Sequence, residues 1–235
     1  MKLIQRQGYL DFLRRNRNRP IVKVVSGIRR CGKSTLFRLF KDELLSEGVK
    51  TEQIISINFE ELEYEHLRDY HALYQYILER MQPNEINYIF LDEIQHVDQF
   101  HRVVDSLFVK ENTDLYITGS NAYFMSSDIA TLLTGRYVEI QMLPLSFSEF
   151  YHSKYDGNQY SLIPAYESYL RESSFPYTQQ LGGEDFDIQE YLRGLYNTLL
   201  LHDVVARLKI SDVTILQDIV RYIMSNIGSL LSPNK

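Results

Sequence analysis

The sequence predicts an α/β protein in which helices cover both faces of a mostly parallel sheet and an all-helical part follows. Two observations predict this class. Short apolar segments typical of buried strands alternate with longer segments of helical spacing up to about residue 145. After Pro144, every remaining periodic segment has helical spacing. We therefore expect the boundary between a sheet-containing core and a helical part near residue 145.

The first elements follow from their apolar spacing and from the residues that end them. Residues 3–15 have the apolar spacing of a helix, which Pro20 ends. The apolar run 21–25 predicts a buried strand, and the glycine-containing residues 26–32 predict a loop. Residues 33–47 then place five apolar side chains on one stripe, which predicts an amphipathic helix.

The alternation continues through the remaining chain, without an internal repeat or a low-complexity linker. Strands are expected at 53–59, 87–91, 114–118 and 137–142. Helices are expected between them at 66–81, 97–109 and 122–133. Helical segments after the boundary are expected at 146–154, 161–173, 186–209 and 213–228.

Charge and composition limit the function classes. The chain has 235 residues with a net charge of −6, but residues 1–40 carry +10 and the remainder −16. This asymmetry predicts an anion site near the N-terminus, for the phosphates of a nucleotide or a nucleic acid. A solvated basic face is the alternative for Arg14 to Arg19. The single cysteine, Cys31, excludes an internal disulfide and favours a cytoplasmic location, and no apolar run predicts a membrane span.

A phosphate-binding loop is predicted where Gly27–Ser34 matches G-x-x-x-x-G-K-[ST]. The match lies between an apolar strand and an amphipathic helix, the context that this motif requires. Backbone N–H groups and the positive end of the helix would hold a phosphate, Lys33 would reach the β- and γ-phosphates, and Ser34 would ligate Mg²⁺. The predicted loop contacts are Gly27, Ile28, Arg29, Arg30, Cys31, Gly32, Lys33, Ser34 and Thr35.

A second nucleotide-binding motif is predicted at the end of the third strand. The apolar run 86–91, interrupted by Asn87, leads directly into Asp92 and Glu93. Asp92 would hold Mg²⁺, and Glu93 would polarise an attacking water, which favours a hydrolase over a kinase. A strand that merely runs into an acidic turn is the alternative. The guanine-reading Asn-Lys-x-Asp and dinucleotide-binding G-x-G-x-x-G patterns are both missing from the sequence.

Together these residues resemble the AAA+-like ATPases of bacteria and archaea that have a G-[VI]-R-R-x-G-K-S-T phosphate loop. The motifs that carry the resemblance are Gly27–Thr35, Ile57–Glu60, Leu91–Gln95, Thr118–Ser120, Leu133–Tyr137 and Pro144–Phe150. The resemblance implies Mg²⁺-dependent ATP hydrolysis coupled to a conformational change, and a five-stranded sheet in the order 5-1-4-3-2. It implies a nucleotide-binding core at 1–145, a helical lid at 146–200 and the truncated start of a winged-helix-like region at 201–235.

The resemblance also implies roles for residues outside the two motifs. Thr118, Ser120 and Asn121 are candidates to sense the γ-phosphate, and Ser120 is the favoured one. A turn without this role is the alternative. Asn58 would hold Glu93 in an inactive pose, or bond its local backbone. Arg136 would act as a finger on a neighbouring subunit's nucleotide and thus imply a homo-oligomer; a surface arginine after a glycine turn is the alternative.

Two other functions stay possible, and the sequence differs from the pattern of the related proteins at one turn. A slowly hydrolysing nucleotide switch or scaffold would not need both Glu93 and Arg136. A DNA-associated ATPase would use the basic N-terminal segment or the missing C-terminal region, although the −16 charge outside residues 1–40 argues against extensive DNA contact here. The departure concerns the lid turn, where Ser173–Pro176 reads Ser-Ser-Phe-Pro and related proteins carry Gly-Gly-x-Pro.

Overall fold

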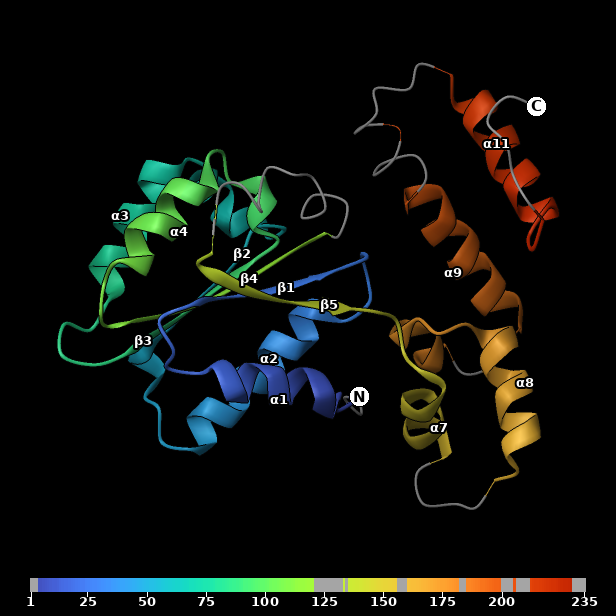
Figure 1. Cartoon of the computed structure of the whole chain (residues 1–235), viewed down its shortest axis with the longest axis horizontal. Helices are drawn as coiled ribbons and strands as arrows, with labels where there is room; N and C mark the ends of the chain where they lie inside the picture. The colour runs from blue at the N-terminus through green and yellow to red at the C-terminus, as the bar shows by residue number, and fades with distance from the viewer. Residues whose placement is uncertain are drawn as a thin grey trace. The chain divides into compact units, whose positions relative to one another are not determined.

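The computed structural model describes residues 4–120, 133, 135–155, 160–181, 185–199, 205 and 212–229, and the chain divides into two compact units, Met1–Gln180 and Leu181–Lys235. The first unit contains a five-stranded parallel sheet in the order β2-β3-β4-β1-β5 (Figure 1). This confirms the predicted α/β class and strand order. The strands are β1 (Val22–Gly27), β2 (Ile54–Asn58), β3 (Asn87–Asp92), β4 (Thr113–Ser120) and β5 (Tyr137–Met142).

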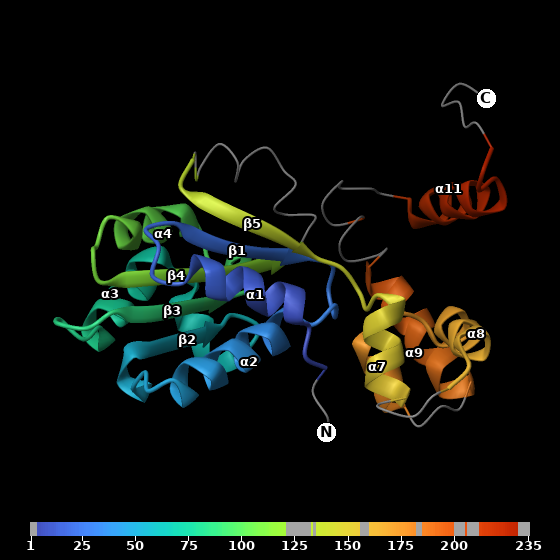
Figure 2. The same cartoon turned by 60° about the horizontal axis from the view of Figure 1, so that its bottom comes forward.

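Helices cover the two faces of this sheet, as Figure 2 shows. One face packs against α1 (Gln7–Asn16) and α2 (Lys33–Ser46), and its core includes a stack of Phe90 on Tyr116 with ring centroids 4.7 Å apart. The other face packs against α3 (Tyr70–Arg80) and α4 (Phe100–Phe108). Strands β1, β3 and β4 are buried along almost their whole length because both faces are covered.

Local capping explains where one predicted helix differs from the structure. The segment expected to be helical from His66 forms a 3₁₀ helix, η2 (Leu62–Arg68), before α3 begins at Tyr70. Asp69 separates them, because its side chain accepts a hydrogen bond from the backbone N–H of Ala72 at 2.9 Å and so caps α3. Short 3₁₀ segments also occur at η1 (Thr51–Gln53) and η3 (Ile94–His96). The helix predicted at 122–133 lies almost wholly outside the described residues.

The helical part begins directly after β5. Helices α7 (Phe147–Tyr155), α8 (Leu162–Glu172) and η4 (Pro176–Gln180) lie in the first unit, with Phe150 packed edge-on against Tyr169. Helices α9 (Asp185–Thr198) and α11 (Val213–Ser225) lie in the second unit. The domain limits at 145 and 200 stay predictions. Among the described helices, none combines the length and the apolar character needed to cross a membrane.

Candidate functional site

The phosphate loop joins β1 to α2 at the carboxyl edge of the sheet, and both of its glycines are required by geometry. A Cβ on Gly27 would lie 2.3 Å from the carbonyl oxygen of Met142, so any side chain there would collide with β5. Gly32 has a φ of 106° and caps α2 in a left-handed conformation. Arg30 also adopts a positive φ, 63°, which is uncommon for a residue with a side chain. The sequence thus folds here into a tight loop ahead of a helix N-terminus.

Lys33 is buried, and its ammonium group lies against the loop and against Glu93. Its Nζ donates hydrogen bonds to the carbonyl oxygens of Gly27 at 3.1 Å and Ile28 at 3.3 Å. The same Nζ lies 3.0 Å from Glu93 Oε1. The structure therefore brings together the two residues to which the sequence assigns phosphate binding and water activation, and pairs them directly.

Glu93 is held at three points in an unusual backbone conformation. Its φ of 55° and ψ of 50° are left-handed, and its backbone N–H donates to Thr118 Oγ1 at 2.9 Å. Its second carboxylate oxygen, Oε2, accepts a hydrogen bond from Gln95 Nε2 at 2.6 Å. Strain of this kind persists only where neighbours determine it and is concentrated at functional sites. Within the part of the chain described, nothing hydrogen-bonds to the buried Oε1 of Gln95.

Asp92 brings a carboxylate to the Ser34 hydroxyl. Burial raises the pKa of Asp92 above its usual range, while hydrogen bonds from Ser34 and Thr118 favour the ionised form and oppose that rise. The Thr118 hydroxyl donates to Asp92 Oδ1. A hydroxyl and a carboxylate at one point form the oxygen donor set that Mg²⁺ prefers, so these residues fit the ion.

A polar cleft of about 400 Å³ opens beside this donor set. It is lined by Ser34, Thr35, Phe37, Arg38, Lys41, Ser56, Asn58, Glu61, Tyr64 and Asp92. Within it, Lys41 Nζ donates a hydrogen bond to Ser56 Oγ at 2.7 Å, and burial lowers the pKa of Lys41. The cleft gives access to Ser34 and Asp92 from the β2 side of the phosphate loop.

A mainly apolar hollow lies on the opposite side of the phosphate loop, next to β5. Its walls are Ile4, Arg6, Cys31, Gly32, Thr35, Leu36, Leu39, Met142, Leu145, Pro176 and Gln180. Pro176 belongs to the turn that departs from the Gly-Gly-x-Pro pattern, and its Cγ lies 4.0 Å from the position of a Cβ on Gly32. The turn therefore reaches the phosphate loop although its glycines are replaced. The hollow is small, about 50 Å³, so a flat ring such as a nucleobase could lie against its apolar wall but not be enclosed by it.

Asn58 and Ser120 lie beside the two motifs. Asn58 is paired with Asp92 in the sheet register, but its Oδ1 accepts from the backbone N–H of Glu60 at 3.1 Å. Its Nδ2 donates to Glu61 at 3.3 Å, so the side chain bonds within its own turn. Ser120 is the register partner of Gly27, so β4 ends next to the start of the phosphate loop.

The two arginines Arg29 and Arg136, both predicted to contact nucleotide, lie at opposite edges of the sheet. Arg29 lies in the phosphate loop, and its Nη1 is 3.7 Å from Glu60 Oε1. Arg136 precedes β5, and its carbonyl oxygen accepts from the backbone N–H of Val22, the first residue of β1. Its half-exposed side chain is 3.0 Å from Asp105 Oδ1. Arg136 thus lies at the amino edge of the sheet, opposite the phosphate loop of its own chain.

Sequence reasoning missed the roles of Thr118 and Gln95. The sequence makes Thr118 a candidate phosphate sensor, but in the structure its hydroxyl joins Asp92 to the backbone of Glu93. Gln95 belongs to the Leu91–Gln95 motif, and its position two residues after Glu93 was the available signal. A contact between side chains on different strands has no such signal, because it depends on the strand order.

Comparison with known families and relatives agrees with this geometry. A family model described as an AAA domain matches residues 19–151. An uncharacterised protein of Haemophilus influenzae is 37% identical over 236 residues, covering 99% of this chain and 58% of the relative. An uncharacterised protein of Methanocaldococcus jannaschii is 30% identical over 224 residues, covering 87% of this chain and 47% of the relative. The chain spans about half the length of these curated relatives.

Two solved structures share the fold. A Walker-type ATPase of Pyrococcus abyssi has a TM-score of 0.55 at 16% identity, over 94% of this chain and 78% of that one. The AMPPCP-bound DnaA of Aquifex aeolicus has a TM-score of 0.51 at 11% identity, over 98% of this chain and 81% of that one. At these identities the likeness concerns the fold alone, which is that of a P-loop ATPase.

Proposed function

Because the chain belongs to the AAA domain family, we propose that it binds ATP with Mg²⁺ in the cytoplasm, hydrolyses it and couples the nucleotide state to a conformational change. The observation that carries this proposal is the contact between Lys33 and Glu93 at the carboxyl edge of the sheet, 3.0 Å apart. The contact joins the phosphate-binding motif to the acidic motif within a P-loop ATPase fold. ATP would lie with its phosphates on the loop and its base against the apolar hollow lined by Met142 and Pro176.

The proposed roles follow from the groups that each residue presents. Lys33 leaves Glu93 and donates to the β- and γ-phosphates. Ser34 and Asp92 would hold Mg²⁺, and the ion would neutralise charge on the phosphate oxygens. The departure of Lys33 releases Glu93 Oε1, which can then accept a hydrogen bond from the attacking water. Thr118 of β4 contacts the Asp92 carboxylate and the backbone N–H of Glu93, so it holds both acidic residues at the carboxyl edge of the sheet.

A slowly hydrolysing switch is the second candidate function. It is favoured by the state of Glu93, whose two carboxylate oxygens are both engaged, one by Lys33 and one by Gln95. A base held in this way is not available to water until Lys33 moves. Turnover at saturating ATP separates the two functions, because a switch would bind ATP and release product only slowly.

The first test is calorimetric titration of Mg²⁺·ATP into the parent and into Lys33→Ala. Hydrogen bonds to charged groups contribute about 1.5–3 kcal/mol, so affinity should fall by about ten- to 150-fold, and turnover should be lost. Lys50→Ala is the matched control, since it removes an exposed lysine that pairs with Glu85 on the surface. Equal affinity in Lys33→Ala and the parent would refute the nucleotide site.

A second test concerns Arg136, which we propose acts on the nucleotide of a neighbouring copy. Its position at the amino edge, away from its own phosphate loop, supports action in trans. Such fingers contribute about 10³–10⁵ in rate. Activity should rise faster than linearly with protein concentration. A mixture of Arg136→Ala, which still binds ATP, and Lys33→Ala, which does not, should recover part of the activity. Parental turnover in assembled Arg136→Ala alone would refute the finger.

A further inference from the structure

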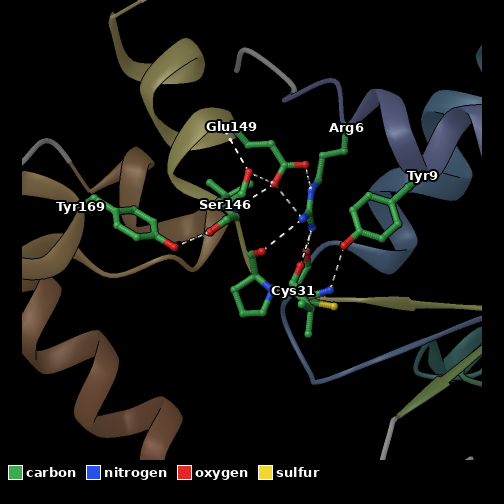
Figure 3. Close-up of polar contacts among 9 residues, drawn as sticks. Arg6, Tyr9, Cys31, Ser146, Glu149 and Tyr169 are labelled. Atoms are coloured by element: carbon green, nitrogen blue, oxygen red, sulfur yellow. Dashed lines mark hydrogen bonds and ion pairs between the residues drawn. The ribbon is translucent and has the colours of Figure 1, made fainter. Parts of the chain in front are cut away.

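The motif Pro144–Phe150 plays no part in the proposed function, but one buried arginine connects it to the phosphate loop. Arg6 precedes α1 and is only 5% exposed. Its Nε and Nη2 donate to the two carboxylate oxygens of Glu149, at 2.8 and 2.9 Å. This bidentate pairing is the geometry in which arginine binds a carboxylate most strongly (Figure 3).

The same guanidinium reaches three backbone carbonyl oxygens. Nη1 donates to Cys31 in the phosphate loop at 3.2 Å and to Leu143 at 2.6 Å, and Nη2 donates to Pro144 at 3.1 Å. Leu143 and Pro144 form the connection from β5 to α7. In Figure 3 the Arg6 side chain points between the loop that carries Cys31 and the helix that carries Glu149. One side chain therefore joins the phosphate loop, the exit from β5 and the start of α7.

Glu149 is held for this pairing by the N-terminus of its own helix. Its Oε2 accepts from the backbone N–H of Ser146 at 2.8 Å, and Ser146 Oγ accepts from the backbone N–H of Glu149 at 3.2 Å. This reciprocal arrangement is a capping box at the start of α7. Burial of the carboxyl opposes its ionisation, but hydrogen bonds from Arg6 and Ser146 outweigh burial and lower the pKa of Glu149.

The pair lies beside the apolar hollow that would receive the base. Arg6 and Cys31 line that hollow together with Met142 and Leu145, which flank the carbonyls that Arg6 binds. Tyr9 adds to the hold, because its ring lies 4.4 Å from the Arg6 guanidinium carbon and its Oη accepts from the backbone N–H of Leu143 at 3.2 Å. A shift of α7 would therefore move Leu145, which lines the hollow, together with Arg6, which binds the carbonyl oxygen of Cys31 in the phosphate loop.

We propose that Arg6, held by Glu149, is a positioning residue that fixes the phosphate loop to the start of α7, so that nucleotide binding and the placement of α7 are coupled. The inference rests on the proposed nucleotide site. Arginine suits the task because its planar fork presents donors in several directions at once, whereas lysine offers one point charge on a flexible stem. Nucleotide binding should then protect the β5–α7 connection from hydrogen exchange, and loss of the fork should remove that protection.

The variants separate the arginine link from the helix cap. Glu149→Gln weakens the pairing with Arg6 but keeps the capping box, in which glutamine can replace glutamate. Ser146→Ala removes the two contacts between the Ser146 hydroxyl and Glu149, at 3.0 and 3.2 Å, but keeps the backbone N–H of Ser146 and both contacts with Arg6, so it is the control for the cap. Arg6→Lys keeps the charge and loses the fork. All three are tested in the full chain for folding by circular dichroism, for Mg²⁺·ATP affinity by calorimetry, for turnover, and for hydrogen exchange over residues 141–150 with and without nucleotide.

We expect Glu149→Gln and Arg6→Lys each to lower ATP affinity by about five- to 20-fold, the lower part of the range usual for coupled sites. In Glu149→Gln, turnover at saturating ATP should stay within about threefold of the parent, since Glu149 lines neither the hollow nor the cleft. Nucleotide-dependent protection of residues 141–150 should disappear in both variants and persist in Ser146→Ala. The double variant Arg6→Lys/Glu149→Gln should lose no more affinity than the weaker-binding single variant, because both changes remove one link.

Two results would overturn the inference. The first is parental ATP affinity and parental nucleotide-dependent protection in folded Glu149→Gln. The second is an equal loss in Ser146→Ala, which would assign the effect to the stability of α7. Failure of the proposed function is recognised separately, because the parent itself would then show no ATP binding that depends on Lys33.

Discussion

One buried lysine–carboxylate pair lies within the parallel sheet and another lies at its carboxyl edge, and they differ in the elements that hold them. Lys23 of β1 pairs with Asp114 of β4, and both are almost fully buried. Asp114 also accepts from the Tyr116 hydroxyl at 2.8 Å and the backbone N–H of Asn18 at 2.9 Å, while Lys23 donates to the carbonyl of Arg19 at 2.8 Å. Each charge thus has several partners in fixed positions.

The pair Lys33–Glu93 has a different surrounding. Lys33 donates hydrogen bonds to carbonyl oxygens of the phosphate loop. Glu93 has a strained backbone conformation and accepts a hydrogen bond from Gln95, which belongs to a short 3₁₀ segment. The adjoining Asp92 lines an open cleft. We infer from this comparison that a buried ion pair enclosed by strands serves the fold, whereas one held by loops at the carboxyl edge can exchange partners with a ligand.

The largest effect that we predict tests the enclosed pair. Asp114→Ala should lower the free energy of unfolding by about 3–5 kcal/mol, because removing one partner leaves the other charge buried. Burial already lowers the pKa of Lys23, so the unpaired amine can lose its proton and keep the loss within that range. Urea denaturation measures the change.

The contrast between the pairs fails if Lys33→Ala destabilises the protein as much as Asp114→Ala does. We expect Lys33→Ala to lower the free energy of unfolding by less than Asp114→Ala does, since Glu93 keeps its hydrogen bond from Gln95 and the adjoining Asp92 lines an open cleft. In the fraction of Asp114→Ala that stays folded, ATP affinity should equal that of the parent.

The next prediction concerns the pair that can exchange partners. Glu93→Gln should lower turnover by about 100-fold or more, since the amide cannot accept a proton from water. ATP should bind at least as tightly as in the parent, because Lys33 no longer has to leave a carboxylate. Single-turnover kinetics and calorimetry on one preparation measure both. Turnover within about threefold of the parent would assign water activation to another residue.

A smaller effect is expected for Gln95, which holds one oxygen of Glu93. Gln95→Ala should lower turnover by about tenfold, or about 1.4 kcal/mol, while ATP affinity stays parental, because the hydrogen bond orients the base and does not touch phosphate. Gln99→Ala, at the end of the same loop, is the control and should behave as the parent. A fall in affinity with unchanged turnover in Gln95→Ala would contradict this role.

The smallest effect is a pH dependence at Glu149. Its pKa lies below the ordinary glutamate value of 4.5, so ionised Glu149 stabilises the folded state at pH above that value. This stabilisation is lost as pH falls through the lower pKa of the folded protein. The difference in free energy of unfolding between the parent and Glu149→Gln should therefore be constant near neutral pH and shrink below about pH 4.5. Urea denaturation across pH 3.5–7 measures it, and a difference independent of pH would contradict the pairing.

The sequence by itself determined the fold class, the alternation of elements and the two nucleotide motifs. Local signals sufficed, since β5 at 137–142 and α2 from Lys33 occur where periodicity and the phosphate-loop pattern predicted them. Where a helix boundary differed, as at Tyr70, one capping side chain explains the difference. The strand order was expected from the family resemblance, and the structure confirms it.

Only the tertiary structure decided which charged side chains meet. Lys23 is part of an apolar run, and its partner Asp114 is distant in sequence; they become neighbours because β4 lies next to β1. The same adjacency places Thr118 against Asp92, and the return of the chain after β5 brings Glu149 to Arg6. Local patterns fix the conformation of a segment, because backbone geometry depends on near neighbours. Contacts between segments depend on which strands are neighbours in the sheet, and no single segment encodes that spatial order.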